Sequence, residues 1–260
     1  MKIAISGKGG VGKSTIAAAL ALLMSRRNRR VLAIDADSDT NLAAALGLSG
    51  EDQHKIIPVA AMVALIEERT GAKVKQYGQV FKLNPEVSDI ADKYATIING
   101  VALLVLGAIE KGGGGCACPE NVLLRALVTD LVLYKNEVVI MDMEPGVEHL
   151  GRATANGVDV MLIVVEPGQR SIDSTHRILG MAKEIGLKNI QLIANKIKQA
   201  DDEKFIQDAF PAHDISGIIP YADQILQSDR AGVSVIDGLP EDLVDHFNKI
   251  LQRLEKQSIK

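Results

Sequence analysis

Residues 1–15 read MKIAISGKGGVGKST. A short apolar run ending at Ile5 leads into the pattern G-x-x-x-x-G-K-S/T, which begins at Gly7, and an alanine-rich, helix-forming segment follows Thr15. The glycines allow positive φ angles and bring backbone N–H groups close to phosphate oxygens. A helix that starts near Lys13 adds unpaired N–H groups and the positive end of its dipole. Strand, glycine-rich loop and helix in this order predict a phosphate-binding loop.

The loop predicts how a nucleotide would be held. Lys13 is expected to reach the β- and γ-phosphates, and the Ser14 hydroxyl is expected to ligate Mg²⁺. A glycine-rich turn with a chance Lys-Ser pair is the alternative. The residues expected to bind the nucleotide phosphates are Gly9, Gly10, Val11, Gly12, Lys13, Ser14 and Thr15.

A second lysine, Lys8, follows the first glycine of the loop. With it, KGGVGKST resembles the deviant Walker A motif of the MinD/ParA/nitrogenase-iron-protein class of ATPases. In that class the extra lysine reaches across a dimer interface to the nucleotide of the other subunit. The resemblance therefore implies an ATP-operated homodimer in which Lys8 and Lys13 act in catalysis. A solvated loop lysine is the alternative interpretation of Lys8.

Composition favours a single α/β domain over residues 1–260. Of the 260 residues, 47% are hydrophobic and 3% aromatic, which suits an aliphatic core between parallel strands and helices. The net charge of −4 argues against general attraction to nucleic acid or anionic membranes. The chain opens directly into a strand and has no apolar run near the roughly 18 residues that a membrane span needs. We therefore expect a cytoplasmic protein.

Apolar runs of strand length alternate with helical segments along the chain. This alternation predicts a P-loop NTPase fold: a mostly parallel central sheet of about seven or eight strands with helices on both faces. A further helix is expected over residues 89–98, and an amphipathic helix over residues 240–255 is expected to pack on the sheet rather than bind a membrane. The expected strands cover residues 3–5, 31–35, 101–106, 138–142, 161–165, 190–194 and 215–219.

Two acidic segments come at the ends of expected strands, where parallel sheets bind ligands. Asp35 and Asp37 lie in the sequence DADSD, and Asp142 ends the strand over residues 138–142. Carboxylates suit a hard cation and can accept a proton from water. The deviant Walker A resemblance implies that Asp37 positions the attacking water, that Asp35 supports the water shell of Mg²⁺, and that Asp142 is the Walker B aspartate. A turn rich in Asp and Ser is the alternative.

Both cysteines of the chain, Cys116 and Cys118, follow four glycines and precede Pro119, which suits the first turn of a helix. Thiolates at a helix N-terminus have a lowered pKa and bind metals readily. A closed zinc site takes four ligands, and two copies of the pair across a twofold axis would supply them. Two small, partly buried residues of no special use, or a redox disulfide, are the alternatives.

The resemblance to the deviant Walker A class also implies which residues contact the adenine base. Asn195 follows the strand over residues 190–194, and its amide would hydrogen-bond the adenine edge as donor and acceptor. Lys196 lies beside it in the sequence, and Pro220 and Tyr221 would lie in a loop over the base. A turn at the strand end is the alternative for Asn195.

Four motifs occur in the order KGGVGKST, DADSDTNL, GGGGCACPEN and DMEPGVEHLGR. Together they resemble the CooC family of ATPases, which mature the nickel-containing carbon monoxide dehydrogenase, over nearly the full chain. The resemblance implies an ATP-dependent homodimeric metallochaperone whose paired Cys116 and Cys118 bind Ni²⁺ or Zn²⁺ at the interface, with carbon monoxide dehydrogenase as client. A MinD/ParA-type positioning ATPase and a nitrogenase-iron-protein-like iron–sulfur carrier are the alternatives.

Overall fold

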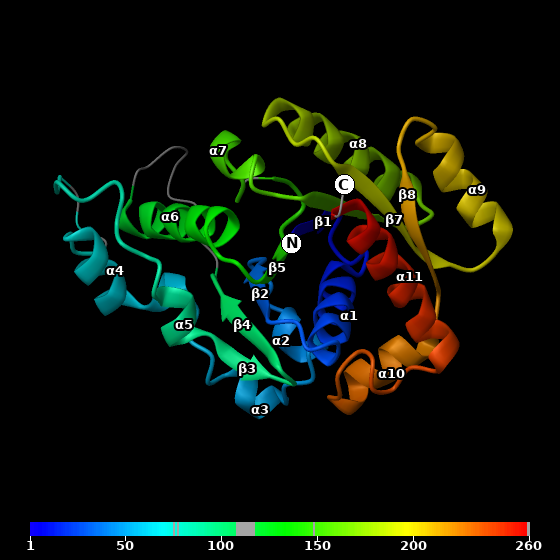
Figure 1. Ribbon diagram of the computed structural model, residues 1–260, viewed down its shortest axis with the longest axis horizontal. Coiled ribbons are helices and arrows are strands. Elements are labelled where there is room, and N and C mark those ends of the chain that lie inside the picture. The colour runs from blue at the N-terminus through cyan, green and yellow to red at the C-terminus, as the bar shows by residue number, and fades with distance from the viewer. Residues whose placement is uncertain (75, 77, 108–117, 148, 259–260) are drawn as a thin grey trace.

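The computed structural model describes residues 1–74, 76, 78–107, 118–147 and 149–258. Within these residues an eight-stranded sheet forms the centre of the molecule, in the order β3-β4-β2-β5-β1-β6-β7-β8 (Figure 1). The strands are β1 Lys2–Gly7, β2 Val31–Ala36, β3 Thr96–Ile98, β4 Val101–Val105, β5 Val138–Met143, β6 Val160–Val165, β7 Ile190–Ile197 and β8 Ile215–Pro220.

Neighbouring strands pair in parallel throughout this sheet, apart from β3, which is antiparallel to β4. The central strands β1, β2, β5 and β6 are buried along their whole length. Continuous aliphatic runs of this kind are typical of parallel strands that helices cover on both faces. The predicted mostly parallel sheet is confirmed.

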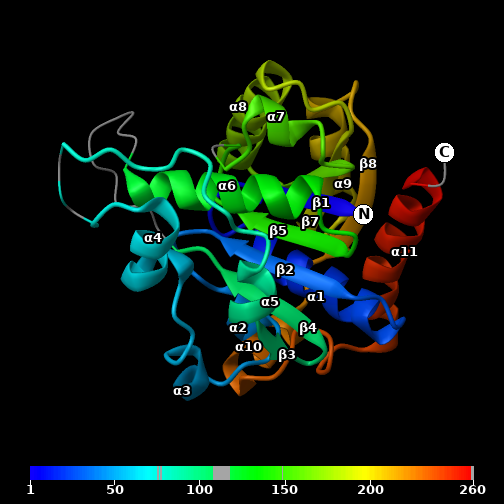
Figure 2. The same ribbon diagram turned by 60° about the vertical axis from the view of Figure 1, so that its left-hand side comes forward.

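Helices cover both faces of the sheet (Figure 2). Alternate residues of β1 point to opposite faces: Ile3 and Ile5 join an apolar layer with α1, α2 and α11, whereas Ala4 joins a second layer with α4, α6, α8 and α9. The described helices are α1 Lys13–Arg26, α2 Leu42–Ala45, α3 Gly50–Gln53, α4 Val63–Thr70, α5 Ile90–Tyr94, α6 Pro119–Leu133, α7 Arg152–Ala155, α8 Gln169–Glu184, α9 Ala200–Ala209, α10 Asp223–Ala231, α11 Glu241–Ser258 and the 3₁₀ helix η1 Val59–Ala61.

The segment over residues 89–98 was wrongly predicted as one helix. The helix α5 ends at Tyr94, and Thr96–Ile98 form the edge strand β3. Asn99 and Gly100, with φ angles of 47° and 82°, make the two-residue turn into β4. Asn-Gly between β-branched residues is a strong hairpin signal, and it overrides the helical periodicity of the preceding residues.

The C-terminal helix α11 packs against the sheet at β8, as predicted, and it also packs against α1. Gly217 in β8 permits close approach, because a Cβ there would overlap the side chain of Ile250. No helix in the described ranges is long and apolar enough to cross a membrane. The buried apolar side chains of α11 are Leu243, Phe247, Ile250, Leu251 and Leu254.

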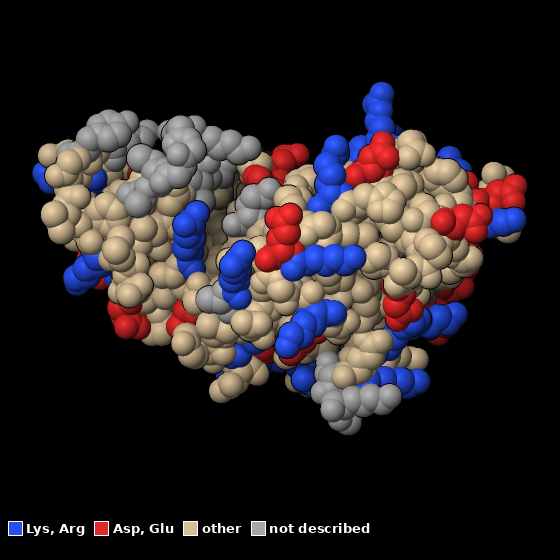
Figure 3. All heavy atoms as spheres, turned by 90° about the horizontal axis from the view of Figure 1, so that it is seen from above, with Lys and Arg blue, Asp and Glu red and all other residues tan. Residues whose placement is uncertain are grey.

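Charged side chains of both signs share the face seen from above in Figure 3. Lys and Arg side chains stand over the middle of this face, with Asp and Glu side chains among and beside them. The formal net charge of the whole chain is only −4. Local ion pairs therefore matter more than the net charge for the electrostatics of the site.

Candidate nucleotide and metal site

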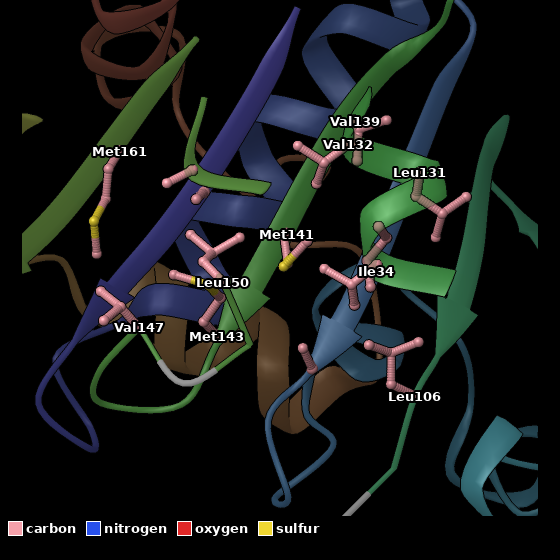
Figure 4. Packing of buried hydrophobic residues seen from close by; sticks show 14 of the residues in the cluster. Ile34, Leu106, Leu131, Val132, Val139, Met141, Met143, Val147, Leu150 and Met161 are labelled. Atoms are coloured by element: carbon pink, nitrogen blue, oxygen red, sulfur yellow. The ribbon is translucent and has the colours of Figure 1, made fainter. Parts of the chain in front are cut away.

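Three loops meet at the carboxyl edge of the sheet. The strands β2, β5 and β1 are consecutive and parallel, so the segments that leave them lie side by side, as the lower part of Figure 4 shows. These segments are the phosphate-binding loop at the end of β1, the DADSD segment (residues 35–39), which begins within the last residues of β2, and the loop after β5 (residues 144–147). Val147 in the last of these loops and Leu150 shortly after it anchor this part of the chain, because both pack into the core beside Met143 (Figure 4).

The phosphate-binding loop requires glycine where its backbone is left-handed or crowded. Gly7 and Gly12 have φ angles of 152° and 98°, a region that residues with a Cβ rarely adopt. A Cβ on Gly7 would also overlap the carbonyl of Val164, and one on Gly12 would overlap the amide of Asn195. The helix α1 begins at Lys13, so its N-terminus faces the loop, as predicted.

Two side chains at the end of β7 hold carbonyl groups of the phosphate-binding loop. Asn195 Nδ2 donates to the Val11 carbonyl at 2.7 Å, and Lys196 Nζ donates to the Gly10 carbonyl at 2.6 Å. Because the C=O and N–H groups of a trans peptide point in opposite directions, the bond to Val11 turns the Gly12 N–H away from Asn195. The Asn195 amide keeps a second N–H and its oxygen for a further partner.

Asp35 lies at the end of β2, opposite Asp142 on β5, and is fully buried. Its two oxygens accept the backbone N–H groups of Asp37, at 3.2 Å, and of Leu42, at 3.1 Å. Burial, followed by the charge of Asp142, raises the pKa of Asp35 to about 7 despite these bonds. Asp35 thus fixes the turn of the DADSD segment into α2.

Asp142 is the carboxylate with the fewest compensating contacts at the site. It is fully buried, and neither oxygen accepts a hydrogen bond of normal geometry from the described residues. Burial raises the pKa of Asp142 to about 6, although the Ser14 hydroxyl and the Lys13 ammonium lie near enough to lower it. A buried carboxylate without a partner is costly, so this position suits a cation.

The oxygen donors at this position fit Mg²⁺. Asp142 supplies a carboxylate and Ser14 a hydroxyl beside it, and Mg²⁺ typically takes few protein oxygens together with water and substrate phosphates. Accordingly, in the part of the chain that the structure describes, no group of three or more His, Cys, Asp or Glu side chains is arranged to hold a metal unaided. The phosphate oxygens of a nucleotide would have to complete the shell.

The ion pair of Lys13 and Asp37 joins two of the predicted catalytic residues. Lys13 Nζ lies 3.2 Å from Asp37 Oδ2, and the two side chains are 6% and 15% exposed. The lysine predicted to bind phosphate is thus paired with the carboxylate predicted to position water. A phosphate oxygen that binds Lys13 would compete with Asp37 for the ammonium. Such competition would couple nucleotide binding to the position of Asp37.

Sequence reasoning missed two residues that connect the three loops. The buried Ser6 hydroxyl donates to the Gly146 carbonyl at 2.9 Å and accepts the Gly146 N–H at 3.1 Å. Glu144 Oε1 accepts the N–H of Ser38 at 3.1 Å, which ties the loop after β5 to the DADSD segment. Their positions along the chain are the only signal that could have indicated these two residues: Ser6 directly precedes the phosphate-binding loop, and Glu144 directly follows β5.

Lys8, the second lysine of the phosphate-binding loop, points toward the end of β6. Its ammonium lies 3.5 Å from Glu166 Oε1, and the Lys8 side chain is 35% exposed. Glu166 is a third residue that sequence reasoning missed, because its contact with Lys8 spans 158 positions of the chain.

A cleft of about 420 Å³ opens beside the phosphate-binding loop. Its walls come from this loop and the start of α1, from α2, from the end of β7, from the loop after β8, and from α10 and the segment that follows it. Tyr221 is held by Lys198, whose ammonium lies 4.4 Å from the centre of the ring. The structure thus brings the predicted base-contacting residues together, and α10 adds an apolar wall that was not predicted. The lining residues include Thr15, Asn195, Lys196, Pro220, Tyr221 and Leu226.

Cys118 occupies the N-cap position of α6, ahead of Pro119, and is partly buried. Burial raises the pKa of its thiol; the N–H of Asn121 opposes this rise, and the carboxylate of Glu120 adds to it. The expectation of a lowered pKa at this helix N-terminus is therefore wrong for Cys118 in the single chain. Cys116 lies outside the described residues.

We expect the ionisation of Asp142 to govern part of the stability of the nucleotide-free protein. Its pKa is raised from 3.8 to about 6 in the folded state, so between these values the folded protein binds more protons than the unfolded chain. The free energy of unfolding therefore falls as pH rises through this window. Asp142→Asn removes that loss. Its free energy of unfolding should exceed that of the wild type by about 1–3 kcal/mol near pH 8, and by little near pH 4. Urea unfolding in EDTA across this pH range measures the difference.

Asp208→Asn, on the exposed surface of α9, removes the same formal charge and is the matched control. Its stability should follow the wild type at every pH. A difference between Asp142→Asn and the wild type that does not change with pH would contradict the prediction. We also expect the Asp142→Asn variant, although more stable, to lose Mg²⁺-dependent ATP hydrolysis. The buried charge of Asp142 lowers stability, but the same charge is what suits this position to a cation.

Known proteins resemble this chain over most of its length. The sequence profile of the CobQ/CobB/MinD/ParA nucleotide binding domain matches residues 2–235. The chain is 44% identical over 240 residues to the carbon monoxide dehydrogenase accessory protein CooC of Rhodospirillum rubrum, covering 92% of this chain and 91% of that protein. It is 40% identical over 257 residues to an uncharacterised ATP-binding protein of Methanocaldococcus jannaschii, covering 97% and 98%. The structure of MinD from Pyrococcus horikoshii with Mg-ADP has a similar fold, with a TM-score of 0.68 at 20% identity over 98% of this chain and 96% of that one.

Proposed function

The chain belongs to the CobQ/CobB/MinD/ParA family of nucleotide-binding ATPases, and we propose that it is an ATP-operated homodimeric metallochaperone. In this proposal, residues 1–260 form one ATPase domain, paired Cys116 and Cys118 hold Ni²⁺ or Zn²⁺ between two subunits, and the client is a nickel carbon monoxide dehydrogenase. The observation that carries the proposal is the similarity to CooC over 92% of the chain. That relative is named an accessory protein of carbon monoxide dehydrogenase.

The nucleotide site supports ATP hydrolysis in this proposal. The phosphate-binding loop and Lys13 bind the phosphates, and Ser14 and Asp142 hold Mg²⁺ directly or through water. Asp35 supports the water around the metal. Bound Mg²⁺ neutralises phosphate charge and orients the nucleotide. Asp37, released from Lys13 when a phosphate takes its place, orients the attacking water and accepts its proton.

The base is held in the cleft beside the loop. Asn195 uses its remaining donor and acceptor for the adenine edge, with Lys196 next to it. Pro220 and Tyr221 cover the base from the loop after β8. Asn195 and Lys196 also donate hydrogen bonds to carbonyl groups of the phosphate-binding loop. These bonds support the proposal that the same two residues position both the base and the phosphates.

A backbone contact supports coupling between the nucleotide and the cysteines. Leu106, directly after β4, donates its N–H to the carbonyl of Asp35 at 2.8 Å, and its own carbonyl accepts the N–H of Ala60 at 2.9 Å. The chain continues from this point toward Cys116 and Cys118. A shift of the DADSD segment on hydrolysis would therefore displace the start of the segment that carries the metal ligands.

The competing functions are less well supported. A MinD/ParA-type positioning ATPase leaves the cysteines without a task, and α11, the helix considered for membrane attachment, buries its apolar side chains. An iron–sulfur carrier of the nitrogenase-iron-protein kind is compatible with four cysteines per dimer. Anaerobically purified protein separates this alternative from ours, because an iron–sulfur protein is brown and a nickel or zinc protein lacks the charge-transfer bands of such a cluster.

The proposal predicts the stoichiometry of metal binding. Titration of the reduced protein with Ni²⁺ or Zn²⁺, with and without ATP, should reach one ion per dimer, because each subunit supplies two thiolates of a four-ligand site. The Cys116→Ser, Cys118→Ser double variant should lose this binding. Calorimetry gives the stoichiometry, and light scattering in the same samples gives the oligomeric state.

His54→Ala, which removes an exposed histidine far from the cysteines in sequence, is the control for adventitious binding and should bind Ni²⁺ or Zn²⁺ like the wild type. Undiminished metal binding in the double cysteine variant would overturn the proposed metal site. One ion per monomer, rather than per dimer, would overturn the shared site between subunits.

A further inference from the structure

Glu166 connects both sides of the phosphate-binding loop. It follows β6, and its two carboxylate oxygens bind different lysines: Oε1 lies 3.5 Å from Lys8 Nζ, and Oε2 lies 3.0 Å from Lys196 Nζ. Lys196 donates in turn to the Gly10 carbonyl at 2.6 Å. The backbone N–H of Glu166 donates to Ser171 Oγ at 3.1 Å, which fixes this position at the start of α8. The carboxylate is therefore held in place between the two lysines.

From this geometry we infer that Glu166 is a positioning residue that holds Lys8 within its own subunit and opposes closure of the dimer until ATP is bound. The inference rests on the proposed function, in which Lys8 crosses to the nucleotide of the partner subunit. A single ammonium that faces Glu166 in its own chain has to leave that contact before it can reach across an interface. Breaking the Lys8–Glu166 contact therefore costs free energy, and this cost makes dimerisation less favourable.

ATP supplies the stronger competing partner. Hydrogen bonds between an ammonium and a phosphate are charge-assisted and strong, and they would form in a closed interface from which water is excluded. The Lys8–Glu166 pair, by contrast, is partly exposed, with side chains 35% and 25% accessible. Pairs of this kind stabilise by about 2- to 5-fold in an equilibrium constant. The contact is therefore strong enough to bias the dimer and weak enough for a nucleotide to break.

Lys196 makes the release of Lys8 reversible. When Lys8 leaves, Glu166 keeps the ammonium of Lys196 at 3.0 Å, so no carboxylate is left without a cation. Lys196 itself is fixed by its bond to the loop and by its position at the end of β7, where its φ is 61°. Glu166 thus stays in place to accept Lys8 again after hydrolysis.

Replacement of Glu166 tests the inference. We compare the dimer dissociation constants of the full-length wild type and Glu166→Gln by sedimentation velocity, with adenylyl imidodiphosphate and Mg²⁺ present and no transition metal added. Because a dimer releases two such contacts of about 2- to 5-fold each, Glu166→Gln should tighten the dimer by about 4- to 25-fold. Damage to the structure would weaken the dimer, so the direction of the effect is itself informative.

Two further variants give the comparison its controls. Glu166→Asp keeps the charge but shortens the side chain, so its dimer should lie between the wild type and Glu166→Gln; it also serves if the amide variant folds poorly. Glu184→Gln removes the same charge at the far end of α8, about 24 Å along the helix, and should leave the dimer unchanged. The affinity of each monomeric variant for a fluorescent ADP analogue should match the wild type.

An unchanged or weaker dimer in Glu166→Gln overturns the inference. A tighter dimer that comes with equally tighter ADP binding also overturns it, because the effect would then run through Lys196 and the phosphate-binding loop. The Lys8→Ala variant separates this failure from failure of the proposed function. If Lys8→Ala still dimerises with the ATP analogue, Lys8 does not cross the interface; if it stays monomeric while Glu166→Gln behaves like the wild type, only the positioning role fails.

Discussion

Replacing Asp37 with Asn is expected to lower ATP turnover by about 100- to 10,000-fold, the range that a positioned general base contributes. The variant keeps the shape of the side chain but cannot accept a proton from water. Nucleotide affinity should stay equal or rise, because Asp37 no longer pairs with Lys13, whose ammonium it faces at 3.2 Å. Phosphate release under single-turnover conditions measures the chemical step, and equilibrium binding of a fluorescent ATP analogue measures affinity.

Asp39→Asn is the matched control for this loss. Asp39 lies in the same DADSD segment, is exposed, and donates its backbone N–H to Asp37 Oδ1 at 3.1 Å. Its own carboxylate makes no contact with Lys13 that the structure records, so turnover should stay close to the wild type. Turnover in Asp37→Asn near that of the wild type would mean that another group orients the water.

Lys8→Ala is expected to abolish ATP-driven dimerisation and to lower turnover by about 1,000-fold, the lower end of what a cation supplied in trans contributes to phosphoryl transfer. The affinity of a single subunit for nucleotide should be kept, because Lys8 faces Glu166 rather than the loop interior within one chain. Sedimentation velocity with an ATP analogue gives the oligomeric state, and steady-state phosphate release gives turnover.

Lys55→Ala removes a lysine that is 76% exposed, far from the loop in sequence, and controls for loss of positive charge. It should dimerise and turn over ATP like the wild type. Normal ATPase activity in Lys8→Ala would argue against a role across the interface. Because Glu166→Gln is expected to tighten the same dimer, the two variants shift one equilibrium in opposite directions.

Much of the fold could be predicted from local sequence. Buried parallel strands are continuous aliphatic runs, so Val31–Ala36 and Val138–Met143 could be predicted to within about one residue without tertiary information. The strand Thr96–Ile98 could not be predicted, because a pattern of three residues is too short to outweigh the helical periodicity of the residues before it. The Asn99-Gly100 turn was the signal that could have corrected this prediction.

The candidate site divides in a similar way. Lys13 and Asp142 belong to motifs whose spacing along the chain reflects a fixed strand–loop–helix geometry, so each could be named from the sequence. The partners Ser6–Gly146 and Lys8–Glu166 could not, since the strand order places β1 between β5 and β6 and brings together residues 140 and 158 positions apart. No local pattern records such a pairing.

The sequence alone was enough to identify a phosphate-binding loop followed by a helix, and the carboxylates at the ends of two strands, because these depend on backbone freedom, strand length and chain order. The tertiary structure established what those groups do to one another. It pairs Lys13 with Asp37, buries Asp142 without a hydrogen-bond partner among the described residues, and places Lys8 against Glu166. The physical reason is that burial and Coulomb interaction depend on distance in space, which the order of strands sets and the order of residues does not.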